Sequence, residues 1–97
     1  EAEYDARLLE ARADVLRIIK ELGIVREQIV AAQQGSEAAG RLAEQARTAA
    51  VSGALNPLLA ADILERSYAS RLRVLEIEQT LVELQIALAV ASGTNVR

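Results

Sequence analysis

The stretch Val51-Ser52-Gly53-Ala54-Leu55-Asn56-Pro57 decides the fold, because it holds the clearest helix breakers of the chain and lies between two long helical patterns. Gly53 is free to adopt a positive φ, the conformation in which many helices end. Asn56 followed by Pro57 is typical of an N-cap and the first residue of a new helix, since proline lacks only an N–H that would be unpaired there. The stretch therefore predicts a tight turn between two helices.

A seven-residue apolar repeat runs upstream of this turn. Its two series are Leu8, Val15, Leu22, Ile29, Ser36, Ala43, Ala50 and Tyr4, Ala11, Ile18, Val25, Ala32, Ala39, Ala46. Such a repeat is typical of a helix that packs along another helix. Gly35 and Gly40 each cost about 1 kcal/mol relative to alanine inside a helix, so a split into two helices at Gly35-Ser36 is the alternative. Because the repeat keeps its phase across both glycines, we predict one helix over about 4–50.

A second repeat downstream predicts a helix over about 57–92, with Gly93 directly after its end. Its first apolar series (seam) is Ala60, Ile63, Ser67, Ser70, Val74, Ile77, Leu81, Leu84, Leu88 and Ala91. A second apolar stripe lies to one side of that seam: Leu58, Ala61, Tyr68, Leu72, Leu75, Val82, Ile86 and Ala89. The first helix has a weaker second stripe, made of Leu9, Leu16, Ile24, Val30 and Ala31. A hairpin alone needs one stripe per helix, so we expect each helix to have two neighbours and the chain to self-associate.

The predicted fold class is all-α: a long antiparallel, coiled-coil-like helical hairpin that spans residues 1–97. If the helices pair from the turn, the region of Val15 lies level with Ser92, and earlier residues have no partner in this chain. Opposite charges four residues apart are expected to support the helices by a few tenths of a kcal/mol each. These pairs are Glu3/Arg7, Arg17/Glu21, Glu37/Arg41 and Asp62/Arg66.

Composition excludes several classes of function. The chain has no His and no Cys, so it offers neither a Ser-His-Asp or Cys-His arrangement nor a usual zinc site. We expect no catalytic residue, no metal and no cofactor. Its 11 basic residues are scattered and outnumbered by 14 acidic residues, which argues against nucleic-acid binding. No apolar run approaches the roughly 18–20 residues that a membrane-spanning helix needs.

Four stretches of the chain carry a further pattern: Ala46-Arg47-Thr48-Ala49-Ala50-Val51-Ser52-Gly53, Leu58-Leu59-Ala60-Ala61-Asp62-Ile63-Leu64-Glu65, the upstream segment 4–12 and the tail 84–93. They resemble the TolC-like outer-membrane efflux channels. The repeats of that family carry a pattern close to Ala-x-x-x-Tyr-x-x-Gly, followed after a few residues by Asp-Val-Leu-x-Ala. The chain departs from the family at Ala50, where a tyrosine is common, so any contact made by that ring is absent or moved.

The resemblance implies a structural role in transport, not an enzyme. In that family, three protomers contribute helical hairpins to a twelve-helix α-barrel in the periplasm, and the hairpin tips meet a periplasmic adaptor linked to an inner-membrane pump. Carried over by position, the adaptor-docking tip is Val51, Ser52, Gly53, Ala54, Leu55 and Asn56, with Gly53 as the turn glycine. The implied location is the periplasmic part of an outer-membrane protein of a Gram-negative bacterium. The chain is then expected to be one hairpin of a longer homotrimeric channel.

Two alternatives remain open. The hairpin of a periplasmic adaptor is also a long antiparallel coiled coil with a docking tip, but Arg47, Ala54 and Leu58 do not match the Arg-x-x-x-x-x-x-Leu-x-x-x-Ser signature expected there. A generic cytoplasmic coiled-coil oligomerisation scaffold that only dimerises needs one apolar stripe per helix, and the second stripe downstream of the turn argues against it.

Overall fold

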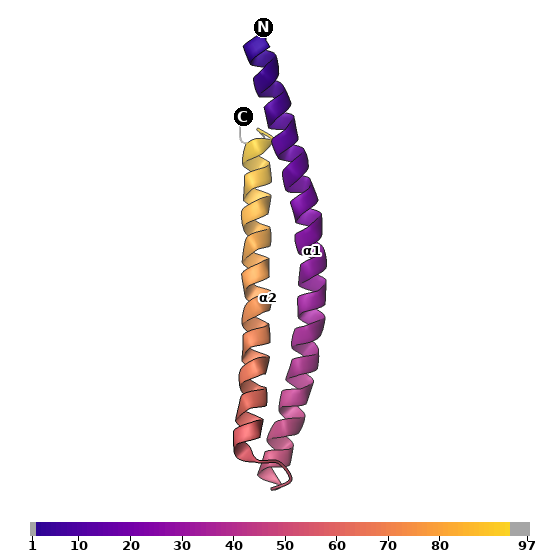
Figure 1. Ribbon diagram of the computed structural model, residues 1–97, viewed down its shortest axis with the longest axis vertical. Coiled ribbons are helices and arrows are strands. Elements are labelled where there is room, and N and C mark those ends of the chain that lie inside the picture. Colours follow the sequence, from indigo (N-terminus) through magenta and orange to yellow (C-terminus); the bar gives the residue numbers. More distant parts are fainter. Residues whose placement is uncertain (1, 94–97) are drawn as a thin grey trace. The chain divides into compact units, whose positions relative to one another are not determined.

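The computed structural model describes residues 2–93, which form two α-helices, α1 (Ala2–Val51) and α2 (Pro57–Ala91). They pack antiparallel as a hairpin, so the predicted all-α fold is confirmed (Figure 1). The helix bounds differ from the predicted 4–50 and 57–92 by one or two residues. Within residues 2–93, neither helix has a stretch apolar enough to cross a membrane.

The first helix is continuous through the two glycines that made a break conceivable. Gly35 and Gly40 both lie inside α1, and a Cβ placed on either would meet no atom within 4 Å. The alternative of two helices joined at Gly35-Ser36 is therefore wrong. The physical reason is that the loss of about 1 kcal/mol at each glycine is small beside the packing of a seam whose phase never changes.

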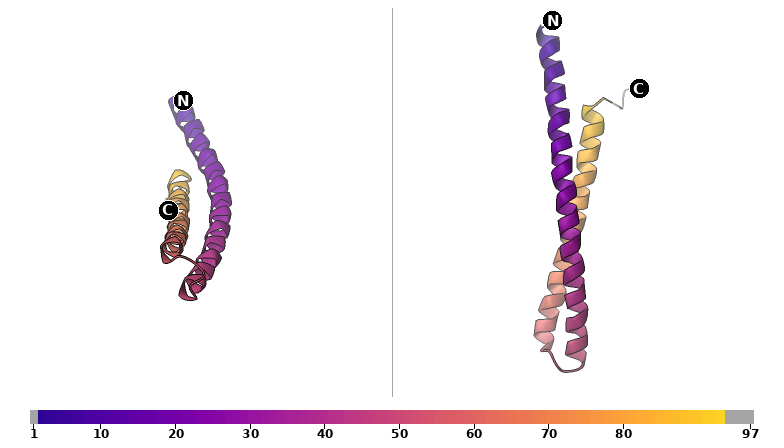
Figure 2. Two further views of the ribbon diagram at one scale, coloured as in Figure 1. Left: turned by 60° about the horizontal axis from the view of Figure 1, so that its bottom comes forward. Right: turned by 90° about the vertical axis from the view of Figure 1, so that its right-hand side faces the viewer.

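The chain divides into two compact units, which we call the turn unit (28–77) and the terminal unit (2–27 with 78–93). In the turn unit the seam is made of small residues on α1, with Ala43 and Ala46 buried, against Ala60, Ser67 and Ile77 of α2. Figures 1 and 2 show these two segments side by side, joined by the turn. The remaining seam positions of this unit are half-buried: Ile29, Ala32, Ser36, Ala39, Ala50, Ile63, Ser70 and Val74.

In the terminal unit the seam is built from larger aliphatic side chains. Ile18, Leu22 and Val25 of α1 are buried, and Leu81, Leu84 and Leu88 of α2 are half-buried. Val15 and Ser92 line the same shallow hollow, as the pairing from the turn predicts. Earlier seam positions of α1, namely Tyr4, Leu8 and Ala11, are exposed. Leu8 and Ala11 nevertheless line the same hollow as Ala91 and Ser92. Among residues 2–93, the part of α1 left beyond the end of α2 is therefore shorter than predicted.

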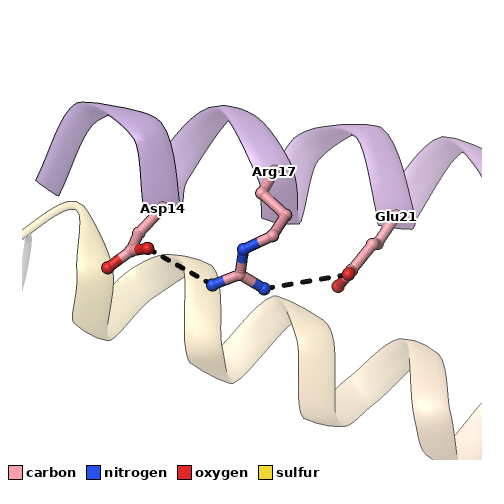
Figure 3. Close-up of polar contacts among 3 residues, drawn as sticks. All are labelled: Asp14, Arg17 and Glu21. Atoms are coloured by element: carbon pink, nitrogen blue, oxygen red, sulfur yellow. Dashed lines mark hydrogen bonds and ion pairs between the residues drawn. The ribbon is translucent and has the colours of Figure 1, made fainter. Parts of the chain in front are cut away.

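The ion pairs support single helices. Those among residues 2–93 include five that each join residues three or four apart on one helix. Three were predicted: Glu3/Arg7, Arg17/Glu21 and Asp62/Arg66. Arg17 also lies 3.4 Å from Asp14, so its guanidinium bridges two carboxylates along α1 (Figure 3). Within residues 2–93, Glu37 and Arg41 form no ion pair, so that prediction is wrong. Both side chains are exposed, and the electrostatic energy of an exposed pair is too small to offset the entropy lost by fixing two long side chains.

Candidate docking tip

Backbone hydrogen bonds fix the end of α1. The N–H of Gly53 donates to the carbonyl of Ala50 at 3.2 Å, and the N–H of Ala54 donates to the carbonyl of Ala49 at 2.8 Å. These two bonds, one nested inside the other, form the Schellman motif that ends many helices. The motif requires a left-handed backbone conformation at Gly53, whose φ is +85°. The prediction that Gly53 has a positive φ where the first helix ends is confirmed.

The carbonyl of Ala49 accepts two further hydrogen bonds. The N–H of Leu55 lies 3.1 Å from it, and the Ser52 hydroxyl donates to it at 3.0 Å. Together with the Ala54 N–H, three donors therefore meet one oxygen. This carbonyl at the end of α1, which has no partner within the helix, is thereby fully hydrogen-bonded by the turn.

The start of α2 is capped as the sequence predicts. The Asn56 side-chain oxygen Oδ1 accepts a hydrogen bond from the N–H of Leu58 at 2.8 Å, and the Asn56 carbonyl accepts from the N–H of Ala60 at 3.0 Å. Pro57 is the first helical residue. Both ends of the turn are thus capped by hydrogen bonds within residues 49–60.

The tip presents an uncharged, partly apolar surface. Residues 48–61 contain no Asp, Glu, Lys or Arg. Five of the six predicted tip residues are exposed, and Leu55 is half-buried. Val51 is 85% exposed and Leu58 is 80% exposed, more than the other large apolar side chains of residues 2–93. The charges that border this surface are already paired, Arg47 with Glu44 at 3.0 Å and Arg66 with Asp62 at 3.1 Å.

The exposed surface extends beyond the predicted residues 51–56. Leu58, which the sequence places in the second stripe, and Leu59 are both exposed in the first turn of α2. The uncharged run 48–61 was the signal that marked this larger surface.

No three potential metal ligands converge anywhere in residues 2–93, and the turn holds only hydroxyl, amide and backbone polar groups. The tip therefore offers its surroundings an uncharged, partly apolar surface.

Comparison with known proteins returns no match, since no protein-family model, no curated protein and no solved structure is significantly similar to this chain. The functional assignment therefore rests on the residues and on the geometry of the tip.

Proposed function

We propose that this chain is a periplasmic hairpin of a TolC-like outer-membrane efflux channel, which forms part of the export tunnel wall and docks a periplasmic adaptor through its tip. The observation that carries the proposal is the tip itself: a turn closed by its own hydrogen bonds, without charge from 48 to 61, that exposes Val51 and Leu58. Covering these two aliphatic side chains contributes roughly 2–4 kcal/mol to an interface at the tip.

The wall role is supported by the second apolar stripes. The residues assigned to the second stripe of either helix are all exposed in the hairpin. Large apolar patches left on a folded chain are typical of interaction surfaces. Helices in the wall of a barrel have a neighbour on each side, and a second stripe serves the second neighbour. The same observation disfavours a simple two-stranded scaffold.

The test is site-specific photo-crosslinking in the cell that encodes the protein. A photoreactive residue replaces Ala54 at the tip, and a matched variant carries it at Gln79, which is also exposed but lies far along α2. We expect the Ala54 variant to crosslink to a periplasmic adaptor that partners an inner-membrane pump, and the Gln79 variant not to do so. A tip that crosslinks only to a cytoplasmic protein, or to no other protein, contradicts the proposal.

A second readout addresses the tip as a contact surface. A two-residue Asp-Lys insertion after Gly53 leaves the helix seams intact and disrupts the closed turn. In the full-length protein we expect this insertion to abolish both adaptor crosslinking and efflux. Unchanged efflux would mean that the stretch is only a turn.

A further inference from the structure

A small polar hollow lies between the two helices of the turn unit. Its volume is about 150 Å³, and both helices line it, among others with Gly40, Glu44 and Arg47 of α1 and Ser67, Tyr68 and Arg71 of α2. These two helix segments belong to the same compact unit, where they run side by side (Figure 2). The hollow thus brings two guanidinium groups, one carboxylate and two hydroxyl groups together from different helices.

Ser67 contributes a hydroxyl group that has no partner in the protein. The residue is only 7% exposed, and within residues 2–93 its hydroxyl makes no hydrogen bond. Since no fully buried side-chain oxygen or nitrogen of residues 2–93 lacks a partner, the Ser67 hydroxyl is reachable from the hollow that it lines. Helical hydroxyls commonly bond to a carbonyl of the preceding turn, as those of Thr48 and Ser52 do. An open hydroxyl on a buried residue is therefore a donor for a bound polar group.

The charged groups give the hollow one net positive charge. Arg47 lies 3.0 Å from Glu44, so these two side chains neutralise each other. Arg71 takes part in no ion pair within residues 2–93. The reason is local, because the positions three and four residues from it on α2 carry no acidic side chain. One guanidinium group at the hollow is thus left for an anion from outside the chain.

We propose that this hollow binds a carboxylate group with a single negative charge. The Arg71 guanidinium is its main partner, and the hydroxyls of Ser67 and Tyr68 are further donors. Guanidinium and carboxylate groups form strong charge-assisted hydrogen bonds, and one negative charge balances the hollow where a phosphate dianion would not. None of these residues belongs to the tip, so the inference does not depend on the channel assignment.

The size of the hollow limits the ligand. A volume of about 150 Å³ equals the share of about five water molecules in the liquid. It therefore admits the side chain of a glutamate or a short free acid such as propionate, and it excludes most larger metabolites. The shared chemistry is a carboxylate on a short aliphatic stem.

Glu44 acts as an internal competitor in this arrangement. Its carboxylate occupies the Arg47 guanidinium and places a negative charge beside the group that would bind. Glu44→Gln removes that charge and frees Arg47 for the ligand, so binding should become tighter by about fivefold. Loss of a residue with a purely structural role would not strengthen binding.

NMR titration of the isotope-labelled chain tests the site. The probes are a short peptide, blocked at both ends, whose single glutamate carries its only charge, the same peptide with glutamine in that place, and propionate. We expect the glutamate peptide to shift the amide signals of Gly40, Ser67 and Arg71 in a saturable manner, and the glutamine peptide to bind at least about tenfold more weakly. Propionate that binds as tightly as the glutamate peptide identifies a free short acid as the ligand, whereas weaker binding identifies a protein side chain. No saturable shift with either carboxylate, or equal binding of the glutamine peptide, overturns the proposal.

Matched variants separate binding from folding. Arg71→Gln should weaken binding by about tenfold and Ser67→Ala by about threefold, whereas Arg73→Gln, outside the hollow, should leave it unchanged. Gly40→Leu should abolish binding because it fills the hollow, and a Cβ at Gly40 meets no atom within 4 Å, so α1 accommodates it. Gly35→Leu adds the same side chain to the same helix away from the hollow and should bind normally. Unchanged binding in Arg71→Gln or in Gly40→Leu overturns the assignment of the site.

Discussion

Replacing Leu22 by alanine measures what holds the two helices together. Leu22 is 3% exposed in the seam of the terminal unit, whereas Leu16, six residues earlier on the same helix, is 67% exposed. Truncating leucine to alanine removes three carbons, worth about 2.4 kcal/mol if they are fully buried. Scaled by burial, the loss is roughly 2.3 kcal/mol at Leu22 and roughly 0.8 kcal/mol at Leu16. A cavity at Leu22 adds to the first value, so we expect about 2.5–4 kcal/mol there.

The assay is urea unfolding followed by circular dichroism, at a dilution where the chain is monomeric. With a slope of about 1–1.5 kcal/mol per molar urea, Leu22→Ala should lower the midpoint by roughly 2 M or leave the chain unfolded, and Leu16→Ala by less than about 1 M. The change in helix propensity is the same in both variants, so the difference reports burial alone. Equal midpoint shifts for the two variants would show that the seam does not stabilise the hairpin, and the reasoning would fail.

Three further outcomes follow from local geometry. Gly53→Ala should destabilise the hairpin by about 1 kcal/mol, because φ is +85° there. Gly35→Ala, inside α1 with open space around its Cα, should instead stabilise the hairpin by about 0.5–1 kcal/mol. Thermal unfolding of both variants checks that the two changes have opposite signs. Asn56→Ala should cost about 1 kcal/mol because it removes the acceptor for the Leu58 N–H, and Asn56→Asp, which keeps that acceptor, should be near neutral in the same assay. Raising NaCl from 0.1 to 1 M should change the free energy of unfolding by less than about 1 kcal/mol, since the five ion pairs are exposed; a larger loss in urea titrations would mean that charges hold the hairpin.

The docking tip illustrates which structural features can be predicted from local sequence preferences. Gly53 and Asn56-Pro57 were enough to predict the turn, because positive φ and N-capping depend on neighbours only a few residues away. The predicted tip stopped at Asn56, although Leu58 was placed in the uncovered second stripe. The exposure of Leu59, which belongs to neither predicted stripe, depends on the direction in which α2 leaves the turn, and no single-residue preference encodes that direction.

The amino-acid sequence by itself determined the two helices, the turn between them and the faces that meet. A seven-residue repeat that keeps its phase through Gly35 requires one long helix, since any break would rotate the apolar stripe away from its partner. Only the tertiary structure decided how deeply each seam position is buried. Leu22 and Ile29 occupy the same position of the repeat, yet Leu22 is buried and Ile29 is half-buried, because burial depends on how closely the neighbouring helix approaches at each level. Which ion pairs form was also decided by the tertiary structure. Arg17 bridges Asp14 and Glu21, whereas Glu37 and Arg41 remain apart. The free energy gained by an exposed ion pair is small, so the local surroundings of each side chain determine whether the pair forms.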